Sequence, residues 1–177
     1  GARVDTAIPH RIHDGYGLND HLIELAAADG VGLILTCDNG IAAVSEIAFA
    51  KSLGMTVLVT DHHEIPYKEE GGSRSFILPP ADVIVNPKQP DCAYPFKKLC
   101  GAAVAWRLTE VLYREAGISQ EEVLDLAEFA AVATVGDIME LQEENRIIVK
   151  EGLKRIHHTK NIGLKSLIEV NGLERDS

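Results

Sequence analysis

The chain of 177 residues has a formal net charge of −10, and 46% of its residues are hydrophobic, which predicts one globular domain or slightly more, with a buried core. It contains no apolar run of the roughly 20 residues that a membrane-spanning helix needs, and its start lacks the layout of a secretory signal. The acidic balance argues against a protein that coats nucleic acids, and the three scattered cysteines argue against a disulfide framework and favour a reducing cytoplasm.

Strand-like and helix-like segments alternate through the first half of the chain. We predict strands at residues 3–9, 32–38, 55–61 and 81–87, and helices at residues 17–30 and 41–54. The segment 67–81, rich in charges, glycine and proline, is typical of a loop. Strands that alternate with helices of this length indicate right-handed βαβ units and a parallel sheet.

After residue 100 the apolar spacing is helical throughout. We predict helices near residues 100–116, 120–135, 143–156 and 163–171. The expected fold class is therefore α/β. A parallel β-sheet with flanking helices occupies residues 1–99, and an all-helical part of the same core occupies residues 100–177 and leads toward a linker.

Polar side chains follow each of the four predicted strands at the point where the strand ends. They are His10 and Arg11, then Asp38 and Asn39, then Asp61, His62 and His63, and finally Asn86. Ligand sites of open parallel sheets lie outside the carboxyl ends of the strands, so we expect these side chains to share one edge. Any one of them is explained equally well by a polar turn or a helix cap, but polar groups at all four ends favour a functional site.

A further candidate, Asp137, follows an almost wholly apolar helical stretch at residues 124–135. A buried carboxylate is costly unless it is paired or bound to a cation, but Asp137 is explained equally well as a solvated cap of the next turn. Asp38, Asp61, Asp137 and the two adjacent histidines form a set of oxygen and imidazole groups without thiolate. Such a set suits Mn²⁺ or Mg²⁺, with Zn²⁺ as an alternative.

A metal site of this composition can carry out phosphate chemistry. Two carboxylate-bridged divalent ions about 3.5–4 Å apart activate a water and neutralise the charge that grows on a phosphate. A histidine outside the ligand set can hydrogen-bond the phosphate or the leaving group, and a nearby arginine can clamp the phosphate. The residues therefore predict a metal-dependent phosphoesterase site around Asp61, His62 and His63.

Five blocks of the sequence resemble the RecJ single-strand-specific exonucleases of the DHH phosphoesterase superfamily. The triplet Asp-His-His at residues 61–63 follows a strand, as in the signature of the superfamily. The blocks IPHRIHDGYGL (8–18), TCDNGI (36–41), VNPKQPDCAYPFKKLCGAAVAW (85–106) and TVGDIMELQEENR (134–146) occur in the family's order and spacing. A lone D-H-H would be a weak signal, whereas five ordered blocks are specific.

The resemblance implies which residues hold metal. Asp38 would bridge two ions, and His62 and Asp137 would complete the shell of one of them. We therefore expect the ligand atoms of these three residues to converge within about 5–6 Å of a common point.

The resemblance also implies the reaction. Asp61 would support the metal shell, His63 would face the scissile phosphate, and Arg11 would contact the substrate. The implied activity is hydrolysis of single-stranded DNA from the 5′ end, with Mn²⁺ or Mg²⁺, in DNA repair and recombination. Single-strand-binding protein and a helicase are candidate partners, and no membrane is involved.

Three parts of the family pattern have no counterpart in residues 1–177. These are the first motif, an aspartate-rich D-x-D-A-D-G block, and the C-terminal substrate-binding and OB-fold domains. We therefore expect a fragment of a catalytic core, in which the missing motif would hold the other metal ion. Because each ion contributes several kcal/mol to stabilising the transition state, we expect little nuclease activity from residues 1–177 alone.

Two other functions stay open. The first is a DHH-family phosphodiesterase acting on short oligonucleotides or cyclic dinucleotides, which would use the same metal ligands. The second is a non-catalytic scaffold module related to RecJ, which degenerate metal positions would favour. The sequence argues against the scaffold, because its five predicted metal-site residues are all present, namely Asp38, Asp61, His62, His63 and Asp137.

Overall fold

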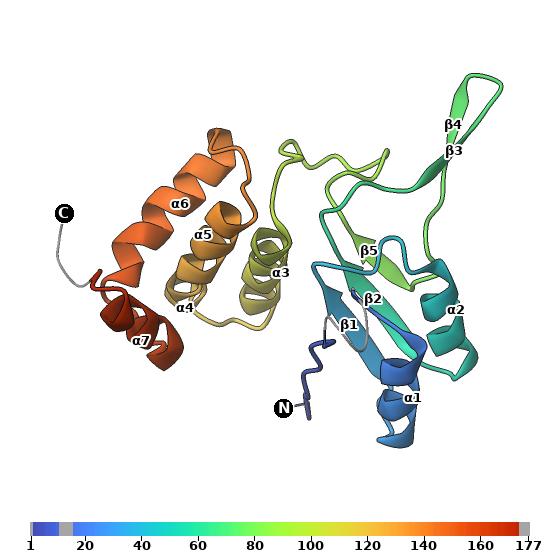
Figure 1. The fold of residues 1–177 in the computed structure, drawn as a ribbon, viewed down its shortest axis with the longest axis horizontal. Helices are drawn as coiled ribbons and strands as arrows, with labels where there is room; N and C mark the ends of the chain where they lie inside the picture. Colours follow the sequence, from blue (N-terminus) through green and yellow to red (C-terminus); the bar gives the residue numbers. More distant parts are fainter. Residues whose placement is uncertain (1, 11–15, 174–177) are drawn as a thin grey trace. The chain divides into compact units, whose positions relative to one another are not determined.

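The computed structural model describes residues 2–10 and 16–173, and the chain divides into two compact units, Gly1–Ala93 and Tyr94–Ser177. The first unit contains a parallel three-stranded sheet in the order β1-β2-β5, formed by β1 (Leu33–Cys37), β2 (Thr56–Thr60) and β5 (Val83–Val85) (Figure 1). The helices α1 (Asp20–Ala28) and α2 (Val44–Ser52) connect to these strands. The predicted α/β fold with a parallel sheet is confirmed.

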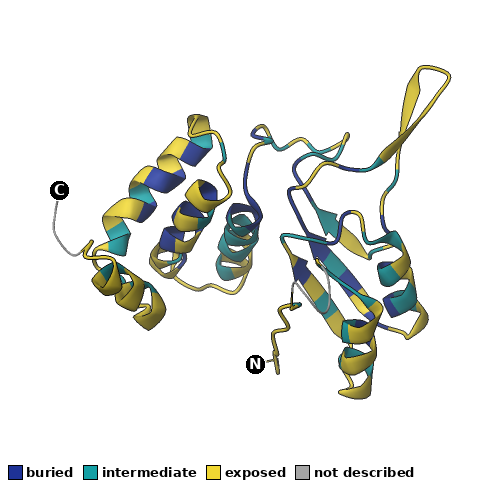
Figure 2. Ribbon diagram, viewed as in Figure 1, coloured by how far each residue is buried: buried dark blue, intermediate teal, exposed yellow. Residues whose placement is uncertain are grey.

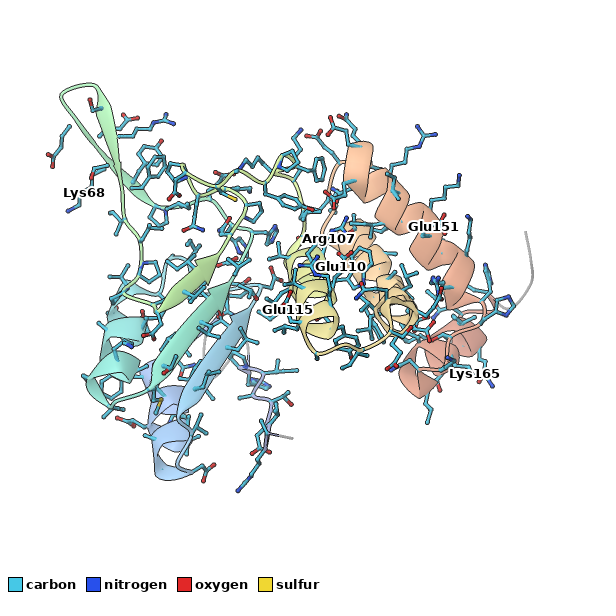
Figure 3. The ribbon with its side chains drawn as sticks, turned by 180° about the vertical axis from the view of Figure 1, so that it is seen from behind. Lys68, Arg107, Glu110, Glu115, Glu151 and Lys165 are labelled. Atoms are coloured by element: carbon cyan, nitrogen blue, oxygen red, sulfur yellow. The ribbon has the colours of Figure 1, made fainter. Side chains whose placement is uncertain are left out.

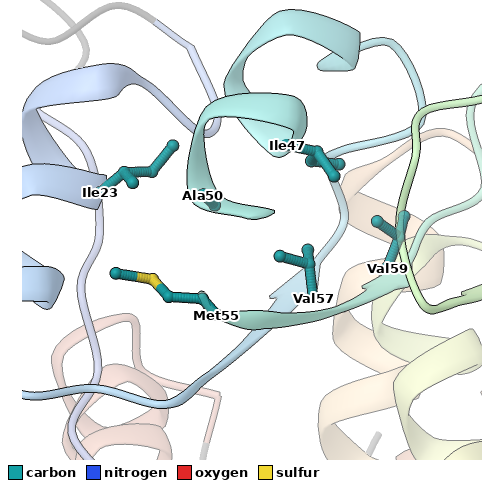
Figure 4. Close-up of a cluster of buried hydrophobic side chains, with 6 residues drawn as sticks. All are labelled: Ile23, Ile47, Ala50, Met55, Val57 and Val59. Atoms are coloured by element: carbon teal, nitrogen blue, oxygen red, sulfur yellow. The ribbon is translucent and has the colours of Figure 1, made fainter. Parts of the chain in front are cut away.

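The core of the first unit lies between one face of the sheet and the two helices. Its buried side chains are Ile23, Ile47, Ala50, Met55, Val57 and Val59 (Figure 4). On the opposite face, Leu33, Leu35 and Val83 are each 51% exposed. The two-residue period of a strand points Val57 and Val59 of β2 toward the helices (Figure 4). The strands of this sheet carry both buried and exposed residues (Figure 2).

The strand predicted at residues 3–9 does not form. The described residues 2–10 have no regular secondary structure. Val4 is 77% exposed and Ile8 is 91% exposed, so neither side chain has a core to pack against. Strand propensity largely reflects packing against neighbours, and this segment has no partner strand among the described residues.

The segment 67–81, predicted as a loop, contains a β-hairpin formed by β3 (Tyr67–Glu70) and β4 (Ser73–Phe76) (Figure 1). Gly71 and Gly72 have φ of 60° and 82°, the positive values that a tight two-residue hairpin turn requires. Tyr67 pairs across the strands with Phe76, their ring centroids 6.1 Å apart. The two adjacent glycines and the aromatic residues on either side of them are the sequence features that could have predicted this hairpin.

The second unit is helical, as predicted. It contains α3 (Gly101–Glu115), α4 (Gln120–Asp125), α5 (Ala127–Gly136), α6 (Glu143–Ile156) and α7 (Ile162–Val170). The single helix predicted at residues 120–135 is divided into two at Leu126, which is both the C-cap of α4 and the N-cap of α5. No helix in the described part of the chain is both long and apolar enough to span a bilayer.

A charged network ties α3 to α6. Arg107 donates through Nε to Glu144 Oε1 at 2.8 Å. It also donates through Nη1 to Glu110 Oε2 at 2.8 Å, and Figure 3 labels both of these residues on α3. The Tyr94 hydroxyl also donates to Glu144, at 2.7 Å. Burial and this hydrogen bond raise the pKa of Tyr94 to about 12, so the tyrosine stays neutral at physiological pH.

The closest approach of α5 and α6 depends on a glycine. A Cβ atom on Gly152 would overlap the Ala131 methyl group and lie 2.7 Å from the backbone oxygen of Ala127. Gly152→Ala should therefore lower the free energy of unfolding of the helical unit by about 2 kcal/mol, because a backbone oxygen cannot move aside. Urea unfolding followed by circular dichroism measures this loss.

The matched control is Gly136→Ala, because Gly136 also lies in a helix, but a Cβ added there would meet nothing within 4 Å in the described residues beyond its chain neighbours and its own helix backbone. Equal urea midpoints for the two variants would contradict the overlap at Gly152.

Candidate metal centre

Asp38 directly follows β1 and begins the sharp turn toward α2. Its amide donates to the Thr60 carbonyl at 3.0 Å, next to the last residue pair of β1 and β2, Cys37 with Thr60. Its φ of 64° lies in the left-handed region, which aspartate tolerates better than most residues. The Tyr16 hydroxyl donates to the Asp38 carbonyl at 3.0 Å. The backbone that carries this carboxylate is therefore held on both sides.

Buried hydroxyl and glycine contacts support the same turn. Thr36 Oγ1 donates to the Asn39 carbonyl at 2.7 Å, and Thr60 Oγ1 donates to the Thr36 carbonyl at 2.6 Å. Gly40 has a φ of 108°, and a Cβ there would lie 2.9 Å from Thr36 Oγ1. Both the conformation and the space therefore require glycine at this position.

Asp61 is a buried carboxylate that organises the turn after β2. Its Oδ2 accepts the Ile41 amide at 2.9 Å. Its Oδ1 accepts the His62 amide at 2.7 Å, the His63 amide at 3.1 Å and His63 Nδ1 at 2.7 Å. Burial acts to raise the pKa of Asp61, but the hydrogen bonds from Ile41, His63 and His62 outweigh it and hold the pKa below its usual value. Asp61 is therefore ionised at neutral pH, with both oxygens engaged.

The ligand atoms of Asp38, His62 and His63 lie within 4.8 Å of one another, which is the spacing expected of groups that share one ion. His62 is buried, and its Nε2 lies 3.0 Å from Asp38 Oδ1. The His63 side chain is 46% exposed, and its ring centroid lies 4.5 Å from that of His62. Because Nδ1 of His63 is bonded to a carboxylate, Nε2 is the nitrogen left with a lone pair for a metal or a phosphate.

A cleft of about 340 Å³ opens beside this ligand group. Its lining includes Asp61 and His63 from the turn after β2, Tyr16 and Gly17 before α1, and residues 39–43 leading into α2. Glu46 and Glu64 add carboxylates to its wall. The cleft and the ligand group therefore share the carboxyl-end edge of the sheet, as expected for an open parallel sheet.

Four of the predicted site residues meet at this edge, namely Asp38, Asp61, His62 and His63. Asp137 belongs to the second unit, where it is exposed at the C-cap of α5, and its convergence with Asp38 stays a prediction. Arg11 lies outside the described residues.

Two supporting residues were not predicted from the sequence. Tyr16 lines the cleft and binds the backbone of Asp38, and Thr36 holds the turn that follows. Tyr16 stands in the D-G-Y-G-L segment, where its aromatic ring between two glycines was the available signal. Thr36 carries no such signal, because a threonine is common in any strand.

Comparison with known proteins identifies the family. The model of the "DHH family, N-terminal domain" matches residues 1–134. The single-stranded-DNA-specific exonuclease RecJ of Bacillus subtilis is 44% identical over 171 residues, a match that covers 97% of this chain and 20% of the relative. The Escherichia coli RecJ is 36% identical over 179 residues, covering 96% of this chain and 30% of the relative. The chain thus spans less than a third of the length of these relatives.

Two solved structures resemble the fold. A crystal structure of exonuclease RecJ bound to manganese matches with a TM-score of 0.76 and 33% identity, covering 93% of this chain and 39% of that one. The structure of Thermus thermophilus RecJ with Mn²⁺ matches with a TM-score of 0.69 and 32% identity, covering 86% of this chain and 21% of that one. The predicted resemblance to RecJ is therefore confirmed, and the chain belongs to the DHH family.

Proposed function

We propose that this chain forms part of a metal-dependent phosphodiesterase, within a RecJ-like exonuclease that degrades single-stranded DNA from the 5′ end. The observation that carries the proposal is the convergence of Asp38, His62 and His63 within 4.8 Å. The names of the RecJ relatives support the reaction and the substrate.

The proposed metal is Mn²⁺ or Mg²⁺, bound by Asp38, His62 and, from the second unit, Asp137. The donor set fits this choice, because it combines a carboxylate with imidazole and has no thiolate. Imidazole favours Mn²⁺ over Mg²⁺, which prefers oxygen ligands and retained waters. The two manganese-bound RecJ structures support the same choice.

The remaining residues are proposed to act on the substrate or to orient the ligands. Asp61 holds the His63 ring by accepting a hydrogen bond from Nδ1 of His63. The other ring nitrogen of His63 is proposed to face the scissile phosphate. Arg11 is proposed as a phosphate contact. When bound, the metal ions would neutralise the charge that develops on the phosphate and lower the pKa of a water.

The biological setting is proposed from the resemblance of the sequence to the RecJ family. We place the parent activity in DNA repair and recombination in the cytoplasm, with single-strand-binding protein and a helicase as candidate partners. We also propose that residues 1–99 and 100–177 are the α/β and helical parts of one catalytic core. The RecJ names of the relatives support the substrate in this scheme.

Metal binding can be measured on residues 1–177 directly. We expect calorimetric titration with Mn²⁺ to show one site, and Asp38→Asn to weaken it at least about tenfold, because the substitution removes the carboxylate of the ligand group. Asp82→Asn is the matched control, since Asp82 binds Lys51 at the other end of the sheet. Equal Mn²⁺ affinities for the two variants would rule out Asp38 as a ligand.

Nuclease activity is best tested in a chimera, defined here as the Bacillus subtilis RecJ with its matching segment replaced by this chain. We expect the chimera to release mononucleotides from 5′-labelled single-stranded DNA with Mn²⁺, and its Asp38→Asn form to be inactive. Residues 1–177 alone should show little activity. Cleavage of cyclic dinucleotides but not DNA would favour the other phosphodiesterase function, and an inactive chimera that still binds Mn²⁺ would favour the scaffold.

A further inference from the structure

The contacts around the end of β5 single out a residue that the proposed reaction does not assign. Asn86 follows β5 directly and is 1% exposed. Its Nδ2 donates to the backbone carbonyl of His63 at 3.0 Å, and its Oδ1 accepts the Lys88 amide at 2.9 Å. Because a backbone amide can only donate, the second contact fixes which end of the Asn86 amide faces His63.

The pairing of the strands brings Asn86 to this position. Thr60 pairs with Val85 between β2 and β5, and the Asp61 amide donates to the Val85 carbonyl at 3.0 Å. The pairing of β2 with β5 ends at this point, and His63 lies beyond the end of β2, outside the sheet. The hydrogen bond from the Asn86 side chain therefore holds the chain at His63, where backbone pairing between β2 and β5 no longer does.

The position of His63 depends on such anchors more than that of His62 does. His62 is buried, whereas nearly half of the His63 side chain is exposed. Asp61 holds the His63 amide and ring nitrogen, and Asn86 holds its carbonyl. An ion pair between Lys88 Nζ and Glu64 Oε1, at 2.8 Å, joins the same two turns.

We infer that Asn86 is a positioning residue for His63, which acts by holding the backbone of the Asp61–His63 turn. The expected effect of Asn86 on turnover rests on the proposed function. Its effect on the position of His63 can be tested without metal or DNA. Both polar ends of the Asn86 side chain bind backbone groups, so we assign Asn86 neither to the ions nor to the reacting atoms. It sets the direction from which the His63 ring faces the phosphate.

Two substitutions separate this role from a general effect on folding. Asn86→Ala removes both contacts. Asn86→Asp keeps the acceptor for the Lys88 amide but loses the donor and places a carboxylate oxygen against the His63 carbonyl. Gln89→Ala is the matched control, because Gln89 is an amide in the same turn whose Nε2 donates to the backbone carbonyls of Ile84, at 3.0 Å, and of Asn86, at 3.4 Å. It therefore removes side-chain hydrogen bonds from this turn but leaves both contacts of the Asn86 side chain in place.

The first measurement is the nuclear magnetic resonance signal of the histidine ring nitrogens in residues 1–177 without metal. We expect the His63 nitrogen bonded to Asp61 to move toward the value of a free imidazole in Asn86→Ala and Asn86→Asp, and to stay unchanged in Gln89→Ala. If the aspartate variant does not fold, as judged by circular dichroism, the alanine variant decides. Unchanged His63 signals in a folded Asn86→Ala, or an equal shift in Gln89→Ala, would overturn the inference.

The second measurement is turnover in the chimera. Loss of a residue that orients an active-site histidine typically lowers activity about ten- to a hundredfold, and we expect this for Asn86→Ala, with Gln89→Ala close to the parent. A chimera that is inactive with Asn86 in place would count against the proposed function, while the metal-free spectra would still decide the role of Asn86. Normal turnover in Asn86→Ala together with a shifted His63 signal would overturn the catalytic part of the inference.

Discussion

Replacing His62 by alanine in the chimera should abolish nuclease activity and weaken Mn²⁺ binding, whereas replacing His63 should lower turnover by about 10²–10⁴ with Mn²⁺ affinity nearly unchanged. The reason is the different position of the two rings. His62 is buried with Nε2 at 3.0 Å from Asp38, while His63 is half-exposed and hydrogen-bonded to Asp61. Calorimetric Mn²⁺ titration and single-turnover rates of both variants measure the two effects separately.

Excess Mn²⁺ provides a control for this assignment, because it should partly restore the His62→Ala variant and have no effect on His63→Ala. The ligand atoms of Asp38, His62 and His63 lie within 4.8 Å of one another, so His63 is also close enough to bind the same ion. If His63→Ala lowers the Mn²⁺ affinity as much as His62→Ala does, both histidines bind the ion.

The second large effect is expected on stability. Asp61→Asn should lower the free energy of unfolding of the first unit by about 3 kcal/mol, because it removes the negative charge and turns one of two accepting oxygens into a donating NH2 group. Three of the donors are backbone amides that the turn cannot move away, those of Ile41, His62 and His63. Urea unfolding followed at the amide signals of β2 measures the change.

Asp82→Asn is the matched control for this prediction as well. Asp82 also accepts a backbone amide, that of Val57 at 2.7 Å, but its carboxylate is open to solvent. Water can therefore replace the lost contact, and the midpoint should move much less. An Asp61→Asn variant as stable as the control would mean that the buried carboxylate does not organise the turn.

The sequence predicted the elements whose pattern does not depend on distant partners. The helix at residues 143–156 was predicted with its observed bounds, and the strands around 32–38, 55–61 and 81–87 each contain an observed strand. These segments carry clear apolar periodicity of their own. The segment 3–9 has similar composition but no regular structure, because a strand needs a neighbour to pair with and composition does not supply one.

At the candidate site, the sequence predicted residue types and their common edge but not their contacts. The carboxyl ends of β1 and β2 bring Asp38 beside His62, as the topology of a parallel sheet requires. That Asp61 accepts hydrogen bonds from its own turn, and that Asn86 holds a backbone carbonyl, depends on side-chain directions that spacing does not encode. Both residues were identified as polar groups at strand ends, and their partners came only from the structure.

The parallel pairing of β1 with β2 has a consequence for the order in which the molecule folds. Parallel neighbours must be joined by a crossover, here α2, so Asp38 and His62 meet only after a long loop has closed. Contacts between residues far apart in the chain generally form late, whereas the hairpin turns and helices form from local contacts. The ligand group should therefore be absent from the folding transition state. An ion bound to it should slow unfolding of the first unit and leave its folding rate almost unchanged.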